Sequence, residues 1–567
     1  MFAILVLVFF PACVQGNYKY QDKSLPVEKR VKDLMGRMSV EEKVAQVSAQ
    51  LLFGDEFYEK RDYSAGHVRN VGHFMAHATP SAVAEAINAD TQKSMEASRW
   101  GIPVLQHGEA LHGAQWGDAT CFPQSIAMGA TFDEDLYYRV GQVVAEELRA
   151  VGVRQVYAPV INITRDQRWG RGQESYGEDV LLNSRMGVAY VKALQEGGVV
   201  ATPKHFVDNY GEGGHDSFAS ITSWRELREV YLEPFRACFR EGGALSTMSS
   251  YNSVDGVPSS CNPVLLQDIL KGEWGFPGYV VSDYGAVEIV SDRMFQAPTQ
   301  DDALARCLEN GLDIQLHTTS KSLLNLVKEG KVSRKTLDEA VRRILTVKFQ
   351  LGLFDEPLVD AEKASSIVRS PAHRELAYES ACKAMTLLKN DGILPLQGVR
   401  RIGLFGPAAD QVNLGDYSGG YAGWGGDGAI SPFEGLKQAF DGVVLLGHGQ
   451  DVSALARQCD VLLFFPSIRE EEGSDRSSFR LPSAREPARR EETGAVIIAS
   501  QQEQRVTIDQ EKMVRDLIAT GKPVVVVLHN GRSSRFPTGS TAPRPCWKPG
   551  IRESRAAGPS RTSSPGP

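Results

Sequence analysis

Short apolar stretches alternate with amphipathic stretches through roughly the first 350 residues of the chain. The apolar stretches are rich in Val and Ile and are bounded by Gly or polar residues, which favours β-strands. We expect strands at 102–105, 153–163, 199–202, 244–248, 279–281 and 313–316, with helices between them at 133–150, 182–196 and 226–240. Strands that alternate with helices form parallel sheets, so the pattern predicts an α/β fold, a (β/α)8 TIM-like barrel.

A further helix is expected near the start of this unit. Ser39 and Glu42 have the spacing of a capping box, in which each side chain accepts a hydrogen bond from the other residue's backbone N–H. The apolar residues Val44, Val47 and Leu51 follow at helical spacing. One helix is therefore predicted to carry all three.

The chain continues into a second α/β unit. A helix at 337–350 ends the barrel, and a second helix is expected at 374–389. After it, the apolar pattern predicts short strands at 400–405, 443–447, 461–465 and 524–528. The predicted division is a signal peptide at 1–16, a barrel at 17–370, a linker at 371–395, an α/β sandwich domain, C-terminally truncated, at 396–531, and a tail at 532–567. The turn after the first of these strands lacks GxGxxG spacing, so no nucleotide cofactor is expected.

Composition excludes several classes of protein. With 567 residues, 42% hydrophobic and 23% charged, the chain is close to the globular average and is neither a collagen, a coiled coil nor a mainly disordered protein. Its net charge of -8 argues against a nucleic-acid partner, which calls for a basic face. The tail at 532–567 differs from the rest, because it holds seven basic residues and one acidic residue, Glu553.

The N-terminal residues resemble a signal peptide. Residues 2–10 read FAILVLVFF, which is too short to span a bilayer, and small residues suited to cleavage follow at 14–16. We therefore expect a secreted or periplasmic protein; Cys13 offers a lipoprotein anchor as an alternative. No later segment is apolar enough to span a membrane, and the eight cysteines show no CxxC pair.

Polar residues with catalytic potential follow the predicted strands at their C-terminal ends. These groups are Glu109 with His112, the stretch 165–171, Lys204 with His205, Tyr251 with Asn252, and Asp283 with Tyr284. Active sites of (β/α)8 barrels lie at this end of the strands. Five such groups at the same end of five strands predict one shared active site.

Two of these residues also suggest a metal site. His107, Glu109 and His112 lie close together in sequence, but the histidines are five residues apart, and Gly108 does not favour the helix that would bring them to one face. No metal or organic cofactor is therefore expected. A carboxylate that hydrogen-bonds sugar hydroxyls is the simpler interpretation of Glu109.

Asp283 follows a buried strand and is the best candidate for a nucleophile. Lys, His and Arg residues at the neighbouring strand ends should hold its carboxyl group ionised at neutral pH, although an acidic residue at this place can also cap a helix. A second carboxylate is available in the acidic run at 470–472 of the second unit. This run is either a solvated loop or a segment that leans over the barrel mouth.

Together these stretches resemble glycoside hydrolase family 3, the β-glucosidase and β-xylosidase group, over residues 25–530. The matching motifs are EALHG at 109–113, RWGR at 168–171 with ESY at 174–176, KHF at 204–206, Met248 with SYN at 250–252, VSDY at 281–284, LLKN at 387–390 with LPL at 394–396, and Glu472 before Asp475 and Arg476. The resemblance implies a barrel followed by an α/β sandwich domain that donates the catalytic acid/base.

The resemblance also implies roles for single residues. Asp283 is the nucleophile and Glu472 the acid/base, with Glu470 and Glu471 as alternatives. The expected sugar ligands are Glu109, Arg171, Lys204, His205, Met248, Tyr251 and Tyr284. His215 stands where many members have Arg, and with Asp216 it resembles the acid/base pair of the family's N-acetylhexosaminidases.

These roles imply hydrolysis by a retaining double displacement on an oligosaccharide or an aryl or alkyl β-glycoside. Tyr284 favours a β-glucosidase over a β-xylosidase of the same family, because many eukaryotic xylosidases have Cys after the nucleophile. A non-catalytic homologue is the rival interpretation, and the intact nucleophile motif argues against it. The sequence leaves the oligomeric state open.

The tail departs from the resemblance beyond about residue 532. Codons that can encode 544–555 can also encode AVLEAWYPGVE when read two bases later, and this is the sequence expected of the family. We therefore interpret 532–567 as the product of a frameshift near 532–544. The stretch 482–504 also departs from the family and is interpreted as an insertion or a second reading error.

Overall fold

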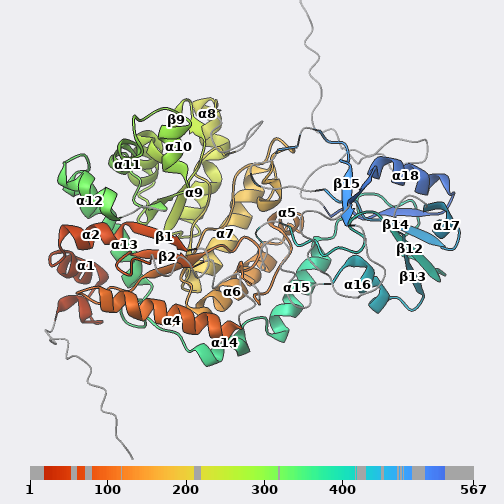
Figure 1. Ribbon diagram of the computed structural model, residues 1–567, viewed down its shortest axis with the longest axis horizontal. Helices are drawn as coiled ribbons and strands as arrows, with labels where there is room; N and C mark the ends of the chain where they lie inside the picture. The colour runs from red at the N-terminus through yellow and green to blue at the C-terminus, as the bar shows by residue number, and fades with distance from the viewer. Residues whose placement is uncertain are drawn as a thin grey trace, which may run out of the picture.

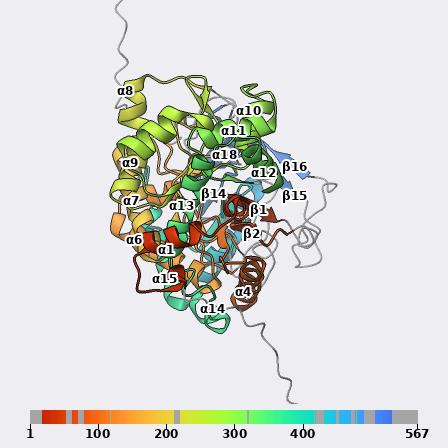
Figure 2. The same ribbon diagram turned by 90° about the vertical axis from the view of Figure 1, so that its left-hand side faces the viewer.

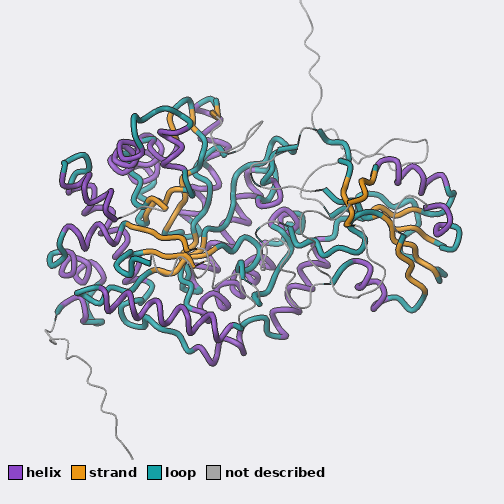
Figure 3. The backbone as a smooth tube through the Cα atoms, viewed as in Figure 1, coloured by secondary structure: helices purple, strands orange, loops and turns teal. Residues whose placement is uncertain are grey.

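The computed structural model describes residues 18–52, 61–70, 79–116, 118–209, 219–316, 320–415, 417, 430–447, 452–468, 472, 475–476, 478–487 and 505–529. The signal peptide with Cys13, His215 with Asp216, Glu470, Glu471 and the tail at 532–567 lie outside these residues. Figure 1 shows a larger lobe that contains the N-terminal part of the chain and a smaller lobe formed by the C-terminal part. In Figure 3 the strands gather in two corresponding groups.

Parallel strands form a closed ring inside the larger lobe. Its strands are β1 (Ser48–Leu52), β2 (His67–Asn70), β3 (Leu105–Gly108), β4 (Gln155–Val156), β5 (Val200–Ala201), β7 (Ser246–Ser249), β10 (Tyr279–Ser282) and β11 (Gln315–Leu316). Six pair in the order β11-β1-β2-β3-β4-β5, and β7 pairs with β10. The parallel bridges Phe206↔Ser249 and Val281↔Ile314 join the two sets, which confirms the predicted barrel.

Helices surround this ring, as Figure 2 shows from the barrel end of the molecule. Those before β4 are α1 (Val27–Met35), α2 (Val40–Gln46), α4 (Pro80–Ala97), α5 (Ser125–Gly129) and α6 (Glu134–Val151). Those between β4 and β11 are α7 (Val180–Glu196), α8 (Trp224–Glu226), α9 (Glu233–Arg240), α10 (Ala286–Asp292) and α11 (Gln300–Glu309). Those after β11 are α12 (Ser320–Lys328), α13 (Arg334–Gln350), α14 (Ala361–Ile367) and α15 (Pro371–Ala384). The remaining helical segments are the 3₁₀ turns η1 (Lys19–Gln21), η3 (Gly172–Glu174) and η5 (Ser259–Cys261) and the π-helical segments η4 (Leu227–Tyr231) and η6 (Val264–Glu273).

The capped helix α2 is shorter than predicted. The capping box of Ser39 and Glu42 is present, but α2 ends at Gln46 and Leu51 lies in β1. The reason is tertiary, because residues 49–52 pair with β2 and the N–H of Gly66 donates to Ala45 O. The helical spacing of the apolar residues therefore continued by coincidence into a strand.

A buried lysine ties together the segments that lead into the first strands of the ring. Lys348 of α13 is fully buried, and its Nζ lies 2.8 Å from Gln46 Oε1, 2.9 Å from Gly66 O and 2.9 Å from Pro103 O. These acceptors come just before β1, β2 and β3. Its three donors are thus all satisfied, as a buried ammonium group requires.

The smaller lobe is an α/β sandwich around a parallel sheet. The strands β12 (Arg401–Phe405), β13 (Val443–Leu446), β14 (Val461–Phe464) and β17 (Val524–Val526) have the order β13-β12-β14-β17. Phe405, Leu462 and Phe464 pack with α17 (Val452–Ala456) and α18 (Gln510–Ala519) on one face. On the other face, Leu404 and Leu463 pack with side chains of α16 (Pro432–Ala439). All four strands were predicted from their apolar pattern.

Short sheets and the linker complete the structure. The sheet β6 (Ala219–Ser220), β8 (Ser253–Val254) and β9 (Val257–Pro258) extends the barrel, and β15 (Ala484–Pro487) pairs antiparallel with β16 (Arg505–Ile508) beside the sandwich. The linker helix is α15, which begins three residues before and ends five residues before the predicted helix at 374–389. No helix in the described part of the chain is long and apolar enough to cross a membrane.

Candidate active site

The predicted site residues converge at the C-terminal ends of the barrel strands. Glu109 directly follows β3, and Lys204 lies just beyond β5. Their side chains form an ion pair of 2.9 Å between Lys204 Nζ and Glu109 Oε2, with both side chains at most 3% exposed. Two residues 95 positions apart in sequence are thus joined because their strands lie in one ring.

Asp283 follows β10 and is buried, with its side chain 7% exposed. Its Oδ1 accepts a hydrogen bond of 2.7 Å from the backbone N–H of Tyr284, and its Oδ2 lies 3.4 Å from His205 Nε2. Burial and then the charge of Glu472 raise the pKa of Asp283, Arg171 and Lys204 act to lower it, and the net pKa is about 7. Desolvation therefore opposes the ionised form that the neighbouring cations were expected to favour.

Arg171 connects the barrel to the second domain. Its Nε and Nη2 each donate to Glu174 at 2.8 Å, and its Nη1 donates to Glu472 Oε1 at 2.9 Å. The Arg171 side chain is 1% exposed, Glu174 is fully buried and Glu472 is 34% exposed. Glu472 of the acidic run therefore reaches the barrel site, whereas Glu470 and Glu471 lie outside the described residues.

Tyr417 is a site residue that the sequence reasoning missed. Its hydroxyl donates to Glu472 Oε2 at 2.6 Å, and its ring lies 5.1 Å from Lys204 Nζ and 5.8 Å from Arg171 Cζ. Lysine and arginine at such distances from a ring are attracted to its π electrons. The available signal was an aromatic residue in a Gly-rich stretch, 415–428, of the second α/β unit.

A close approach of the backbone lets this second-domain loop reach the barrel. Gly415 has φ +81°, and a Cβ there would lie 2.3 Å from Gln124 Nε2. Gln124 Nε2 also donates to Leu414 O at 3.0 Å. Glycine adopts this positive φ without steric cost, so Gly415 favours the backbone turn that precedes Tyr417.

Hydrogen bonds to the barrel fix the segment around Glu472. Gly170 N donates to Asp475 Oδ1 at 2.7 Å, and Arg476 N donates to Arg168 O at 2.8 Å. These bonds join the Asp–Arg pair after the acidic run to the RWGR motif of the barrel. They position the second domain against the strand ends.

The remaining predicted ligands also lie at this end of the ring. Met248 is buried in β7, and Tyr251 is half-buried two residues beyond the end of that strand. Tyr284 Oη lies 3.4 Å from His107 Nε2. Tyr284 therefore packs beside β3 as well as following Asp283.

The histidines of the metal alternative have different neighbours. His107 lies beside Tyr284, whereas His112 Nδ1 is 2.8 Å from Phe122 O and its Nε2 is 3.0 Å from Gln124 Nε2. Among the residues that the structure describes, no group of three or more His, Cys, Asp or Glu side chains could hold a metal ion.

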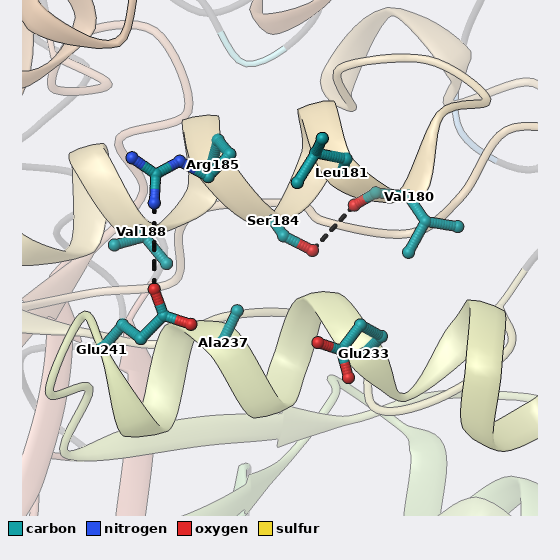
Figure 4. Close-up of a pocket in the computed structure, with 8 residues that line it drawn as sticks. All are labelled: Val180, Leu181, Ser184, Arg185, Val188, Glu233, Ala237 and Glu241. Carbon is teal, nitrogen blue, oxygen red and sulfur yellow. Dashed lines mark hydrogen bonds and ion pairs between the residues drawn. The ribbon is translucent and has the colours of Figure 1, made fainter.

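A groove of about 350 Å³ lies elsewhere, between α7 and α9 (Figure 4). Its lining is Val180, Leu181, Ser184, Arg185, Val188, Glu233, Ala237 and Glu241. Arg185 and Glu241 face each other across it at 3.9 Å. None of the predicted site residues lines this groove.

The fold and the site together define a class of enzyme. A parallel barrel that holds a buried carboxyl group at its strand ends, with a second carboxylate from the neighbouring domain bound to Arg171 there, fits a hydrolase that cleaves glycosidic bonds. The chain belongs to glycosyl hydrolase family 3: its residues 39–347 match the family 3 N terminal domain and residues 385–542 match the C-terminal domain. It is therefore a glycoside hydrolase.

Named relatives include enzymes of two activities. A β-xylosidase of Formosa agariphila is 31% identical over 575 residues, which cover 94% of this chain and 71% of that protein. A periplasmic β-glucosidase of Salmonella typhimurium is 30% identical over 538 residues, or 88% of this chain and 68% of that protein.

Solved structures of β-glucosidases have the same fold. One from Erythrobacter marinus has a TM-score of 0.81 and 29% identity, and the match covers 92% of this chain and 74% of that one. One from Listeria innocua, in complex with glucose, has a TM-score of 0.75 and 26% identity, with 89% and 70% covered.

Proposed function

We propose that this glycoside hydrolase is an exo-acting β-glucosidase that removes terminal non-reducing β-D-glucosyl residues with retention of configuration. The observation that carries the proposal is the meeting of two carboxyl groups from different domains. Asp283 from the barrel and Glu472 from the sandwich interact electrostatically, and both are close enough to Arg171 for its charge to act on them. Glycosidases cleave between such a pair.

In the proposed first step, Asp283 attacks the anomeric carbon and forms a glycosyl ester. Glu472 gives its proton to the departing glycosidic oxygen, so the alcohol leaves neutral. In the second step the ionised Glu472 takes a proton from water, which attacks the anomeric carbon and restores the Asp283 carboxylate. A retaining enzyme of this kind has carboxyl groups about 5–5.5 Å apart.

The two carboxyl groups must differ in protonation when the substrate arrives. The charge of Glu472 is one of the causes that raise the pKa of Asp283. A proton on Glu472 removes that cause and favours an ionised Asp283. One shared proton thus supplies the acid and the nucleophile together.

The proposed sugar ligands surround this pair. Lys204 and Glu109 are joined at 2.9 Å and His205 lies beside Asp283, so a cation, a carboxylate and an imidazole can each bond a sugar hydroxyl. Met248, Tyr251 and Tyr284 supply further contacts. No metal or organic cofactor is included in this proposal.

Replacement of each carboxyl group tests the assignment. Asp283→Ala should abolish turnover of an aryl β-glucoside. Glu472→Ala should lose most activity and regain it with added azide, because azide can attack the glycosyl ester without a general base. Rescue by azide at Glu470→Ala or Glu471→Ala instead would overturn the acid/base assignment, and a wild-type protein that cleaves no aryl glycoside would favour the non-catalytic homologue.

The sugar is proposed from Tyr284 and from the number of β-glucosidases among similar structures, one of them in complex with glucose. The alternative, β-xylosidase, is supported by relatives such as that of Formosa agariphila. Comparing kcat/KM for 4-nitrophenyl β-glucoside and 4-nitrophenyl β-xyloside decides between them. A higher value for the xyloside would overturn the glucosidase proposal.

We also propose that the enzyme is exported after cleavage near residue 16. The support is the FAILVLVFF stretch, and one relative is named a periplasmic β-glucosidase. The mass of the mature protein isolated from its native host tests this. An intact N-terminal Met would contradict it.

A further inference from the structure

The acid/base candidate of the second domain is held at both carboxylate oxygens. Arg171 donates to Glu472 Oε1 at 2.9 Å, and the hydroxyl of Tyr417 donates to Oε2 at 2.6 Å. Arg171 is also tied to Glu174 by two bonds. Tyr417 is therefore the partner that can be changed without also disturbing the buried pair Arg171–Glu174.

Tyr417 is itself held by the barrel rather than by its own domain alone. Its ring packs against the apolar core of the barrel, and the charged ends of Lys204 and Arg171 lie 5.1 Å and 5.8 Å from the ring centre. The side chain thus has fixed contacts on the barrel and carries one hydroxyl toward Glu472. It forms a bridge by which the barrel orients a carboxylate that the second domain supplies.

We propose that Tyr417 is a positioning residue, which orients the Glu472 carboxyl group over the barrel site by its hydroxyl hydrogen bond. This inference rests on the proposed role of Glu472 as acid/base. A hydroxyl that donates to a carboxylate favours the ionised form, which is the form that must deprotonate water in the second step. Loss of the hydroxyl both misplaces the acid and makes Glu472 a weaker acid.

Tyr417→Phe tests the inference with two substrates. Phenyl β-glucoside needs a proton for its poor leaving group, whereas 2,4-dinitrophenyl β-glucoside leaves without one. We expect kcat/KM to fall about tenfold for the phenyl substrate and less than about twofold for the dinitrophenyl substrate. The basic limb of the pH profile for the phenyl substrate should move up by about one pH unit, since a hydrogen bond to a charged group is lost.

A double variant separates positioning from substrate binding. In the Glu472→Gln background, Tyr417→Phe should leave kcat/KM for the dinitrophenyl substrate unchanged, because the residue acts through Glu472. The matched control is Tyr378→Phe, because Tyr378 lies on α15 and is 68% exposed. This variant should behave as wild type. The melting temperature of each variant confirms that it is folded.

Three results would overturn the inference. These are equal losses with both substrates in Tyr417→Phe, an unshifted pH profile, and a further loss in the double variant. Failure of the proposed function looks different: Glu472→Gln would then cleave phenyl β-glucoside at the wild-type rate. If Glu472→Gln is inactive on that substrate while Tyr417→Phe equals wild type, only the role of Tyr417 fails.

Discussion

Replacing Glu174 by Gln should destabilise the barrel far more than the same change at a similar pair on the surface. Glu174 is fully buried and accepts two bonds of 2.8 Å from Arg171, whose side chain is 1% exposed. Glutamine keeps the shape but offers one acceptor oxygen, so one guanidinium N–H loses its partner and the buried cation loses a balancing charge. The lost charge-assisted bond is worth about 1.5–3 kcal/mol.

The remaining contact with Glu472 limits the damage. Glu472 still accepts a bond from Arg171 in this variant. The total loss of unfolding free energy in Glu174→Gln should therefore lie near the lower end of the range for breaking a buried ion pair, about 3 kcal/mol. The control is Glu339→Gln, which also breaks a Glu–Arg pair at i,i+3 spacing. Glu339 and Arg342 are 54% and 46% exposed, so this loss should be below about 0.5 kcal/mol.

Urea unfolding followed by tryptophan fluorescence measures both losses, since the buried Trp169 lies two residues from Arg171. The expected result is a clear drop in the unfolding midpoint for Glu174→Gln and almost none for Glu339→Gln. Equal losses in the two variants would refute the reasoning that burial determines the strength of this pair.

Two other substitutions have outcomes that follow from the structure, and a third prediction concerns the reading frame. The pKa of Asp283 is raised from 3.8 to about 7, chiefly by burial, so its ionisation destabilises the folded protein as pH rises through that window. At about 1.36 kcal/mol per pKa unit, Asp283→Asn should gain about 4 kcal/mol at pH 8 and progressively less below pH 7 in thermal unfolding. An equal gain at pH 5 and pH 8 would contradict this. Lys348→Met removes all three donors to buried acceptors and should lower the free energy of unfolding in urea by about 2–4 kcal/mol. The control is Lys363→Met, which should change stability little because the Lys363 side chain is 74% exposed. Sequencing of the gene and its transcript across codons 532–544 should reveal the shifted reading frame; an unbroken frame in both would reject the frameshift.

Local patterns were enough for strands made of a largely apolar run. Each strand of the second-domain sheet was predicted, because the four residues of β14, for example, are all apolar and buried. β1 and β2 were not predicted. Leu51 continues a helical spacing, and β2 reads HVRN with one apolar residue, so only pairing with neighbouring strands makes these segments extended.

Some residues of the candidate site could likewise be predicted from the local sequence, whereas others depend on tertiary contacts. Polar groups at the ends of successive apolar strands pointed to Glu109, Lys204, His205 and Asp283, because parallel strands bring those ends together. The partner of Arg171 in the second domain lies 301 residues away, and Tyr417 contacts the site through a loop without a periodic pattern. For residues that reach a site from another domain, the local sequence indicates the residue type but not which side chain each one meets.

The sequence by itself determined the alternation of strands and helices, the end of the barrel at which the chemistry lies and the residue types available there, because these depend on neighbours along the chain. Tertiary structure decided which charges meet. It joined Lys204 to Glu109 and Arg171 to Glu174 and Glu472, and it buried Asp283 deeply enough to raise its pKa to about 7. Electrostatic energies depend on distance and on exclusion of water, and both are fixed only when distant segments pack against one another.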